Sequence, residues 1–144
     1  MGGILLDTNV LSELMRTKPS AEVLGWFGQQ QETSFFISAI TRAEILLGIA
    51  LLPAGKRCDG LAVSAEQMFA EDFAGRNLPF DEACATEYAL LVAARTRQGR
   101  AISTEDAQIA AIALTHHLPM ATRNTKDFKD IAGLAVLNPW DTNG

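Results

Sequence analysis

The chain has 144 residues, of which 48% are hydrophobic and 20% are charged, and its formal net charge at pH 7 is −5. This length suits one domain over residues 1–144 with a sizeable core. The acidic balance disfavours broad, non-specific nucleic-acid binding, which depends on neutralising phosphates. No apolar run approaches the roughly 20 residues that a membrane span requires, and the N-terminus lacks the pattern of a secretion signal, so we expect no membrane association and a cytoplasmic location.

Strand and helix patterns alternate along the chain. Short apolar runs predict strands at residues 3–7, 35–38, 77–80, 119–122 and 135–138. Apolar periodicity and capping residues predict helices at 8–15, from 20 through 27, at 41–52, at 56–73, from 81 to about 97, and at 104–116. This alternation predicts an α/β fold whose central sheet is mainly parallel and covered by helices on both faces.

Three acidic residues occupy comparable places along this pattern. Asp7 directly follows the apolar run 4–6, Glu44 follows the second expected strand, and Asp106 lies at the start of the last long helix. Open α/β sheets place ligands outside the carboxyl ends of their strands. If the three carboxylates converge there, their mutual repulsion calls for a cation, most simply Mg²⁺ or Mn²⁺. Such an ion would activate bound water and offset charge on a transferring phosphoryl group.

Each acid also has a structural interpretation. The run 41–44, Thr-Arg-Ala-Glu, matches a capping box in which Glu44 reaches back to the helix N-cap amide. Asp106 offers a similar local role, and an acid in the first helical turn gains about 0.3–1 kcal/mol from the helix dipole. Asp7 fits this interpretation less well, because burying an unpaired carboxylate costs far more than a cap returns.

Hydroxyl and basic side chains near these acids suggest supporting roles. Three hydroxyl residues could orient the carboxylates or cap helices and turns: Thr8, Ser38 and Thr122. For Ser38, capping is the stronger interpretation. Basic residues gather in two short stretches, 95–100 and 123–129. A basic rim around an acidic metal centre would hold a phosphate backbone, although a solvated helix end equally explains the first stretch.

Four short segments in order resemble the PIN domain of VapC toxins. They are Leu-Leu-Asp-Thr-Asn at 5–9, Ser-Ala-Ile-Thr-Arg-Ala-Glu at 38–44, Asp-Ala-Gln-Ile-Ala-Ala at 106–111 and Ala-Thr-Arg-Asn at 121–124. Asn-Pro-Trp at 138–140 is similar to the FitB-like branch of that family. The resemblance covers essentially the whole chain. It implies a three-layer PIN fold and a metal-dependent ribonuclease, the toxin of a type II toxin–antitoxin pair.

The resemblance also implies partners. Members of the family form homodimers, bind a small VapB-like antitoxin and cleave RNA. DNA contact would come only through the antitoxin, because this chain has no basic helix suited to reading DNA.

Residue by residue, the resemblance assigns Asp7, Glu44 and Asp106 as the catalytic, metal-binding acids. Many members carry a fourth acid in a Thr-x-Asp segment, where this chain has Thr-Arg-Asn at 122–124. Asn124 coordinates without contributing charge, so a second metal site should be weak, and Asp127 is an alternative fourth acid. Accessory roles fall to Thr8 and Thr122, and two basic side chains beside the motifs are candidates for contacts with RNA: Arg42 and Arg123.

Two other functions compete with the ribonuclease. A metal-dependent phosphohydrolase would use Asp7 as a nucleophile, but no acid stands two residues after it to serve as its acid/base partner. A non-catalytic protein-interaction module would use the acids only as helix caps, and it would have no metal affinity.

Overall fold

The computed structural model describes residues 2–141. Its strands are β1 (Gly2–Leu6), β2 (Thr33–Ser38), β3 (Asn77–Leu78), β4 (Met120–Ala121) and β5 (Val136–Leu137). Its helices are α1 (Thr8–Leu14), α2 (Ala21–Gly28), α3 (Ala39–Ala50), α4 (Lys56–Glu71), α5 (Glu82–Arg97), α6 (Thr104–Thr115) and α7 (Thr125–Phe128).

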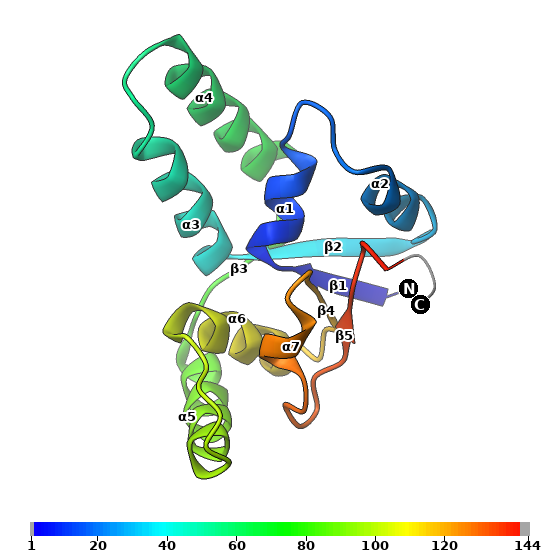
Figure 1. Cartoon of the computed structure of the whole chain (residues 1–144), viewed down its shortest axis with the longest axis vertical. Helices are drawn as coiled ribbons and strands as arrows, with labels where there is room; N and C mark the ends of the chain where they lie inside the picture. The colour runs from blue at the N-terminus through cyan, green and yellow to red at the C-terminus, as the bar shows by residue number, and fades with distance from the viewer. Residues whose placement is uncertain (1, 142–144) are drawn as a thin grey trace.

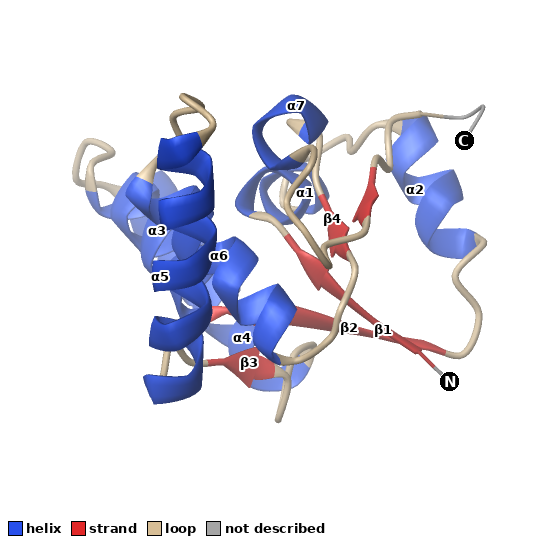
Figure 2. Cartoon of the chain, turned by 90° about the horizontal axis from the view of Figure 1, so that it is seen from below, coloured by secondary structure: helices blue, strands red, loops and turns tan. Residues whose placement is uncertain are grey.

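The strands form one parallel sheet in the order β3-β2-β1-β4-β5. Helices α1 to α4 lie above the sheet in Figure 1, and α5 to α7 lie below it. Figure 2 shows the same division from below. The predicted three-layer α/β fold is therefore confirmed, and β1 lies at the centre of the sheet.

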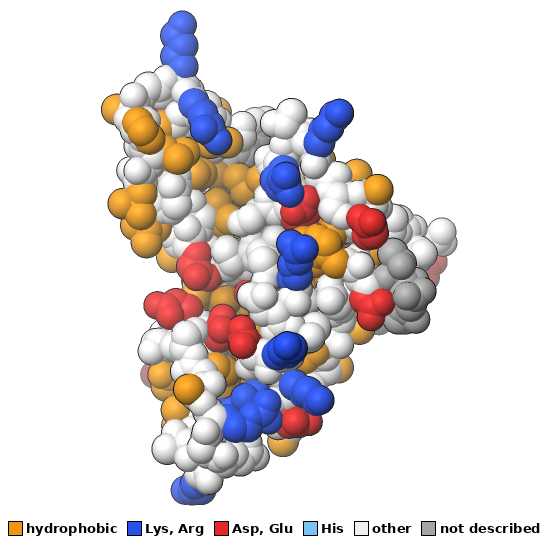
Figure 3. All heavy atoms as spheres, viewed as in Figure 1, with side chains coloured by type: hydrophobic (Ala, Val, Ile, Leu, Met, Phe, Trp, Pro, Cys, Tyr) orange, Lys and Arg blue, Asp and Glu red, His pale blue; other side chains and the backbone are white. Residues whose placement is uncertain are grey.

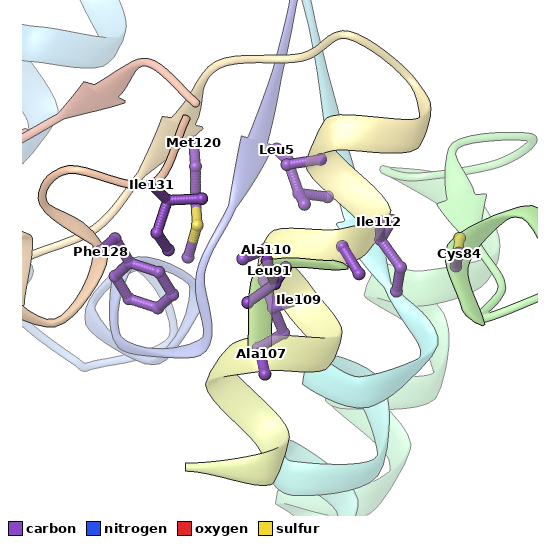
Figure 4. Packing of buried hydrophobic residues seen from close by; sticks show 12 residues of the cluster. Leu5, Cys84, Leu91, Ala107, Ile109, Ala110, Ile112, Met120, Phe128 and Ile131 are labelled. Atoms are coloured by element: carbon purple, nitrogen blue, oxygen red, sulfur yellow. The ribbon is translucent and has the colours of Figure 1, made fainter. Parts of the chain in front are cut away.

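Alternating residues of β1 supply a separate core on each face. Ile4 and Leu6 pack with α1, α3 and α4 on one side. Leu5, which is fully buried, packs with α5, α6 and the loop around α7 on the other. Figure 4 shows Leu5 beside Ile109 and Met120 in this second core. The apolar run predicted as a strand is thus buried on both faces, as a central parallel strand requires.

Local differences from the sequence prediction are small and have physical causes. Strand β2 begins at Thr33, two residues earlier than expected, because it pairs along the length of β1. Helix α7 was not predicted, since a single turn is too short to show helical periodicity. It is held by its buried Phe128 and by Arg95 of α5, whose Nη2 donates to the carbonyl oxygens of residues 127 and 129 at 3.1 and 2.8 Å.

The expectation of a basic rim at 95–100 is wrong for Arg95. Arg95 is only 4% exposed, so its charge serves the fold rather than the surface. Arg100 forms an ion pair with Asp130 at 3.2 Å. Among the described helices, none is long and apolar enough to cross a membrane.

Candidate functional site

The register of the sheet places Asp7 beside Thr122. Leu6 of β1 pairs with Ala121 of β4, so the residues that follow them leave the same edge of the sheet together. The Asp7 amide also donates to the Ala121 carbonyl at 2.9 Å, which extends the pairing by one position. Parallel strands thus bring together two side chains that the sequence holds far apart.

Asp7 is 4% exposed and accepts hydrogen bonds on both carboxylate oxygens. Its Oδ2 accepts from the Thr122 hydroxyl at 2.7 Å, and its Oδ1 accepts from the Thr8 amide at 2.8 Å, which makes Asp7 the N-cap of α1. Burial raises the pKa of Asp7 to about 6 against the pull of these two hydrogen bonds, and the charges of Asp106 and Glu44 raise it further.

Thr122 organises the site through a single hydroxyl group. Its Oγ1 donates to Asp7 and accepts from the Asn9 side-chain amide at 3.2 Å and from the Asn124 backbone amide at 3.1 Å. The one proton and both lone pairs of the hydroxyl are then engaged. Thr122 is fully buried, so it holds Asp7 in a fixed orientation.

Glu44 is linked to Asp7 through the residue between them in space, Thr8. The Thr8 hydroxyl donates to Glu44 Oε1 at 2.6 Å and lies 3.0 Å from the Thr41 hydroxyl. Because the single Thr8 proton goes to Glu44, Thr41 must be the donor to Thr8. The resulting chain of hydroxyls connects α1 to α3.

The capping box predicted at 41–44 is wrong. The N-cap of α3 is Ser38, whose hydroxyl accepts from the Thr41 amide at 3.0 Å. The capping role expected for Ser38 is therefore confirmed. Glu44 lies beyond the first turn of α3 and turns its carboxylate to α1 instead.

Asp106 approaches the other acids from the first turn of α6. The N-cap residue Ser103 accepts from the Asp106 amide at 3.1 Å. Burial raises the pKa of Asp106 against a hydrogen bond to Ser103, and the charges of Asp127, Glu44 and Glu105 raise it further. The alternative fourth acid, Asp127, therefore lies close enough to influence Asp106.

Asn124 reaches the site through its backbone. Its amide donates to Thr122, while its side chain is exposed. Asn124 is also the N-cap residue of α7, but its side chain makes no capping hydrogen bond. Figure 3 shows acidic side chains grouped on one face, over the starts of α3 and α6.

These acids are chemically suited to a divalent ion, although they are not drawn together around one. Within residues 2–141, no Lys or Arg forms an ion pair with Asp7, Glu44 or Asp106, and no three Asp, Glu, His or Cys side chains are arranged to hold a metal. Mg²⁺ commonly takes one or two carboxylates and keeps several waters. Mutually repelling, hydrogen-bonded carboxylates therefore fit such an ion in donor chemistry and in charge.

Of the two basic residues expected to contact RNA, the structure engages Arg42 elsewhere. Its guanidinium forms an ion pair with Glu66 at 3.0 Å and lies 4.9 Å from the centre of the Phe69 ring, which joins α3 to α4. The assignment of Arg42 as a contact for RNA stays a prediction, in which the substrate would compete with Glu66 for the guanidinium. Arg123 is exposed beside the acidic site, and its backbone amide donates to Asn9 Oδ1 at 3.1 Å.

Sequence reasoning missed the roles of Asn9 and Thr41. Both are polar residues in helix first turns, where capping is the usual explanation, and only their partners reveal otherwise. The one available signal was their position within the two segments that also carry Asp7 and Glu44.

Comparisons with known proteins identify the family. A family model described as PIN domain matches residues 4–134. The chain is 48% identical to plasmid stability protein StbB of Pseudomonas syringae pv. tomato, over 96% of this chain and 99% of that protein. It is 42% identical to VapC ribonuclease Y4jK of Sinorhizobium fredii, over 96% and 98% of the two chains. It also superposes on a FitAB structure bound to an IR36 DNA fragment with a TM-score of 0.87, at 42% identity and 98% coverage of both chains. The chain belongs to the PIN-domain family, in the branch that holds the VapC and FitB toxins.

Proposed function

We propose that the protein is a Mg²⁺-dependent ribonuclease (with Mn²⁺ as the alternative ion) that acts as the toxin of a VapBC-like toxin–antitoxin pair. The observation that carries the proposal is the buried carboxylate of Asp7, coupled by charge to Glu44 and Asp106 with no basic side chain paired to any of them among the described residues. Relatives at 33–42% identity that are named VapC ribonucleases supply the reaction class.

Asp7, Glu44 and Asp106 are the residues that would hold the ion. A bound divalent cation supplies an activated water and neutralises charge on the phosphorus centre. The chain itself supplies orientation, because Thr122 fixes Asp7 and Thr8 fixes Glu44 through short hydrogen bonds. Asp7 must be ionised to act as a ligand, and its raised pKa means that the ion competes with a proton near pH 6.

The test is hydrolysis of total RNA by purified protein as Mg²⁺ is titrated, with excess EDTA as the metal-free reference. Asp7→Asn, Glu44→Gln and Asp106→Asn should each lower the rate by orders of magnitude while the thermal melt stays cooperative. Glu105→Gln is the matched control, since it removes one exposed acid from the same helix turn as Asp106. Full activity of Asp7→Asn, or of wild type in EDTA, contradicts the proposal.

Two further measurements, hydrolysis of small phosphate esters and calorimetric Mg²⁺ binding, separate the alternatives. A phosphohydrolase would turn over small phosphate esters and leave RNA intact. An interaction module would show no calorimetric Mg²⁺ binding, and its explanation of Glu44 as a capping-box residue no longer holds.

We further propose that a small antitoxin covers the acids and supplies a cation among them. An apolar groove of about 250 Å³ runs along α1, α3 and α4 and ends on Thr8 and Glu44. Helices α3 and α4 also expose three large apolar side chains, Leu47, Leu51 and Val63. Figure 3 shows an apolar area over these helices, above the acids. An amphipathic segment docked there would place an Arg or Lys at the acids.

In this arrangement DNA contact comes through the antitoxin, as the FitAB complex with DNA suggests. Growth arrest on expression, relieved by the neighbouring open reading frame, is the expected result. Soluble protein without toxicity in several hosts counts against it.

The chain is also proposed to form a homodimer. Leu90 of α5 is 63% exposed, and it borders a partly enclosed cavity of about 250 Å³ with Leu91, Leu114 and Ile131. An exposed apolar surface of this kind is commonly covered by a partner. Light scattering at micromolar concentration should give twice the chain mass of 15.5 kDa.

A further inference from the structure

A second polar hollow opens beside the acidic site, between the end of α1, the start of α2 and the C-terminal Trp140. It is open to solvent, measures about 450 Å³, and is lined by three cationic side chains: Arg16, Lys18 and Arg123. Its size falls in the range of ligand sites, roughly 300–1,000 Å³.

Arg123 ties this hollow to the proposed chemistry. It directly follows Thr122, whose hydroxyl holds Asp7, and its own amide is fixed by Asn9. Its guanidinium lies over the Trp140 ring at 5.0 Å from the ring centre. The ring therefore braces a flat cation one residue away from the network that positions the catalytic acid.

The acids of the hollow are already engaged. Glu13 accepts from the Ser20 amide at 2.8 Å and pairs with Arg16 at 3.3 Å. The Ser20 amide, followed by Arg16 and Arg123, holds the pKa of Glu13 below its ordinary value. Glu22 accepts from the Ser20 hydroxyl at 2.6 Å.

Positive charge therefore remains available at the surface. Arg16 keeps 67% of its side chain exposed even while paired. Lys18 and Arg123 form no ion pair with any described residue.

Basic side chains also line a second hollow next to this one. Arg16 and Lys18 also line a neighbouring hollow of about 750 Å³ that reaches Arg57 at the start of α4. Figure 3 shows basic side chains in a column down the same face that carries the acidic group. A net acidic protein thus presents a series of basic side chains on the face that carries the acids.

We propose that this hollow is a subsite for an unpaired nucleotide of the RNA that flanks the scissile phosphate. The base stacks on the Arg123–Trp140 pair, and Arg16 and Lys18 bind the phosphates that follow. Unpaired bases stack on aromatic rings and on guanidinium planes, whereas a duplex hides its bases, so the subsite selects single-stranded RNA. This inference rests on the proposed ribonuclease function.

The test uses a short 2′-O-methyl oligouridine in EDTA, a probe that binds without cleavage. Trp26→Phe serves as the background, so that Trp140 is the sole tryptophan. Stacking should quench Trp140 fluorescence on binding the oligonucleotide, whereas inorganic polyphosphate should bind without quenching.

Two kinds of variant separate stacking from charge. Arg123→Lys keeps the positive charge but removes the planar guanidinium on which a base stacks. We therefore expect the oligouridine to bind about tenfold more weakly, with an unchanged salt dependence. Trp140→Phe keeps a ring and should retain most of the affinity, which is read for this variant from the anisotropy of a fluorescently labelled oligouridine. Arg16→Met with Lys18→Met should lower the slope of log affinity against log salt by about 1.4, at about 0.7 for each phosphate that is no longer neutralised.

Arg97→Met is the matched control, because it removes an exposed cation at the end of α5, and it should bind as wild type does. Equal affinity for wild type, Arg123→Lys and Arg16→Met/Lys18→Met, or no binding at all, overturns the subsite. Weakened capture of the antitoxin with unchanged RNA binding also overturns it and assigns the hollow to the protein partner. Hydrolysis of total RNA by wild type is measured separately, so a failed subsite leaves the ribonuclease function standing.

Discussion

Thr122 donates its hydroxyl proton to Asp7 Oδ2 at 2.7 Å, although 115 positions separate the two residues in the chain. The contact stabilises the ionised form of a carboxylate that burial pushes toward protonation. It also joins the ends of β1 and β4 at the sheet edge that carries Asp7. The competition between burial and this one hydrogen bond sets how readily Asp7 carries its charge.

Replacing Thr122 by Val should raise the pKa of Asp7 above its value of about 6 and weaken metal binding. The substitution keeps the shape and removes the hydroxyl, which leaves the half-buried side-chain donor of Asn9 without its nearest acceptor. We expect a loss of about 1–3 kcal/mol in unfolding free energy. An NMR titration of the Asp7 carboxyl and a thermal melt measure both effects. Thr122→Ser retains the hydroxyl, so it should keep the Asp7 pKa and the stability near their wild-type values. An unchanged Asp7 pKa in Thr122→Val would refute the role given to the hydroxyl.

Without metal, titration of Asp7 should lower the stability of the protein as pH rises from about 4 to 6. Folding raises the pKa of Asp7 from 3.8 to about 6, so in this window the folded state keeps a proton that the unfolded chain has released. The loss of unfolding free energy that Asp7 causes over this window amounts to at most about 3 kcal/mol, and it does not increase further above pH 6. Melts in EDTA across this range should show the decline in wild type and a shallower one in Asp7→Asn. Equal slopes in the two proteins would show that Asp7 is ionised at its ordinary pKa.

Asn124→Asp should reduce the metal concentration that activity requires. Its backbone is bound to Thr122 and its side chain is exposed, so an added carboxylate joins the acidic face without repacking the core. Charge count helps to set divalent-ion affinity. The same charge should lower the melting temperature in EDTA through repulsion. Gln31→Glu, an equal charge change in an exposed loop, should alter neither, and a null result at residue 124 would direct attention to Asp127.

Arg95→Met should destabilise the fold by about 2 kcal/mol. The guanidinium binds two carbonyl oxygens at the end of α7, and hydrogen bonds to charged groups contribute about 1.5–3 kcal/mol. Loosening α7 would also move Asp127 relative to Asp106. Chemical denaturation should show the loss for Arg95→Met and less than about 0.5 kcal/mol for Arg97→Met, which lies on the surface of the same helix. Equal stability of the two variants would mean that Phe128 alone holds α7.

The sequence by itself predicted the parallel sheet covered by helices and singled out the three acids, whereas the central position of β1 came from the structure. An apolar run followed directly by Asp7, and long helices between short strands, leave few other arrangements. The sequence could not identify the partners of Glu44, because a capping box and a hydroxyl contact to α1 require the same residue types. The choice depended on where α3 begins, and the packing of Ser38 at the end of β2 decided that.

Only the tertiary structure showed that Arg42 and Arg95 are engaged internally while Arg123 remains available. In sequence all three are simply basic residues, and nothing local to any of them predicts its partner. Their partners, Glu66 of α4, the carbonyls of α7 and the ring of Trp140, come from distant parts of the chain. Residue type fixes the charge of a side chain. The elements that pack around it decide whether that charge is used inside the fold or presented to a ligand.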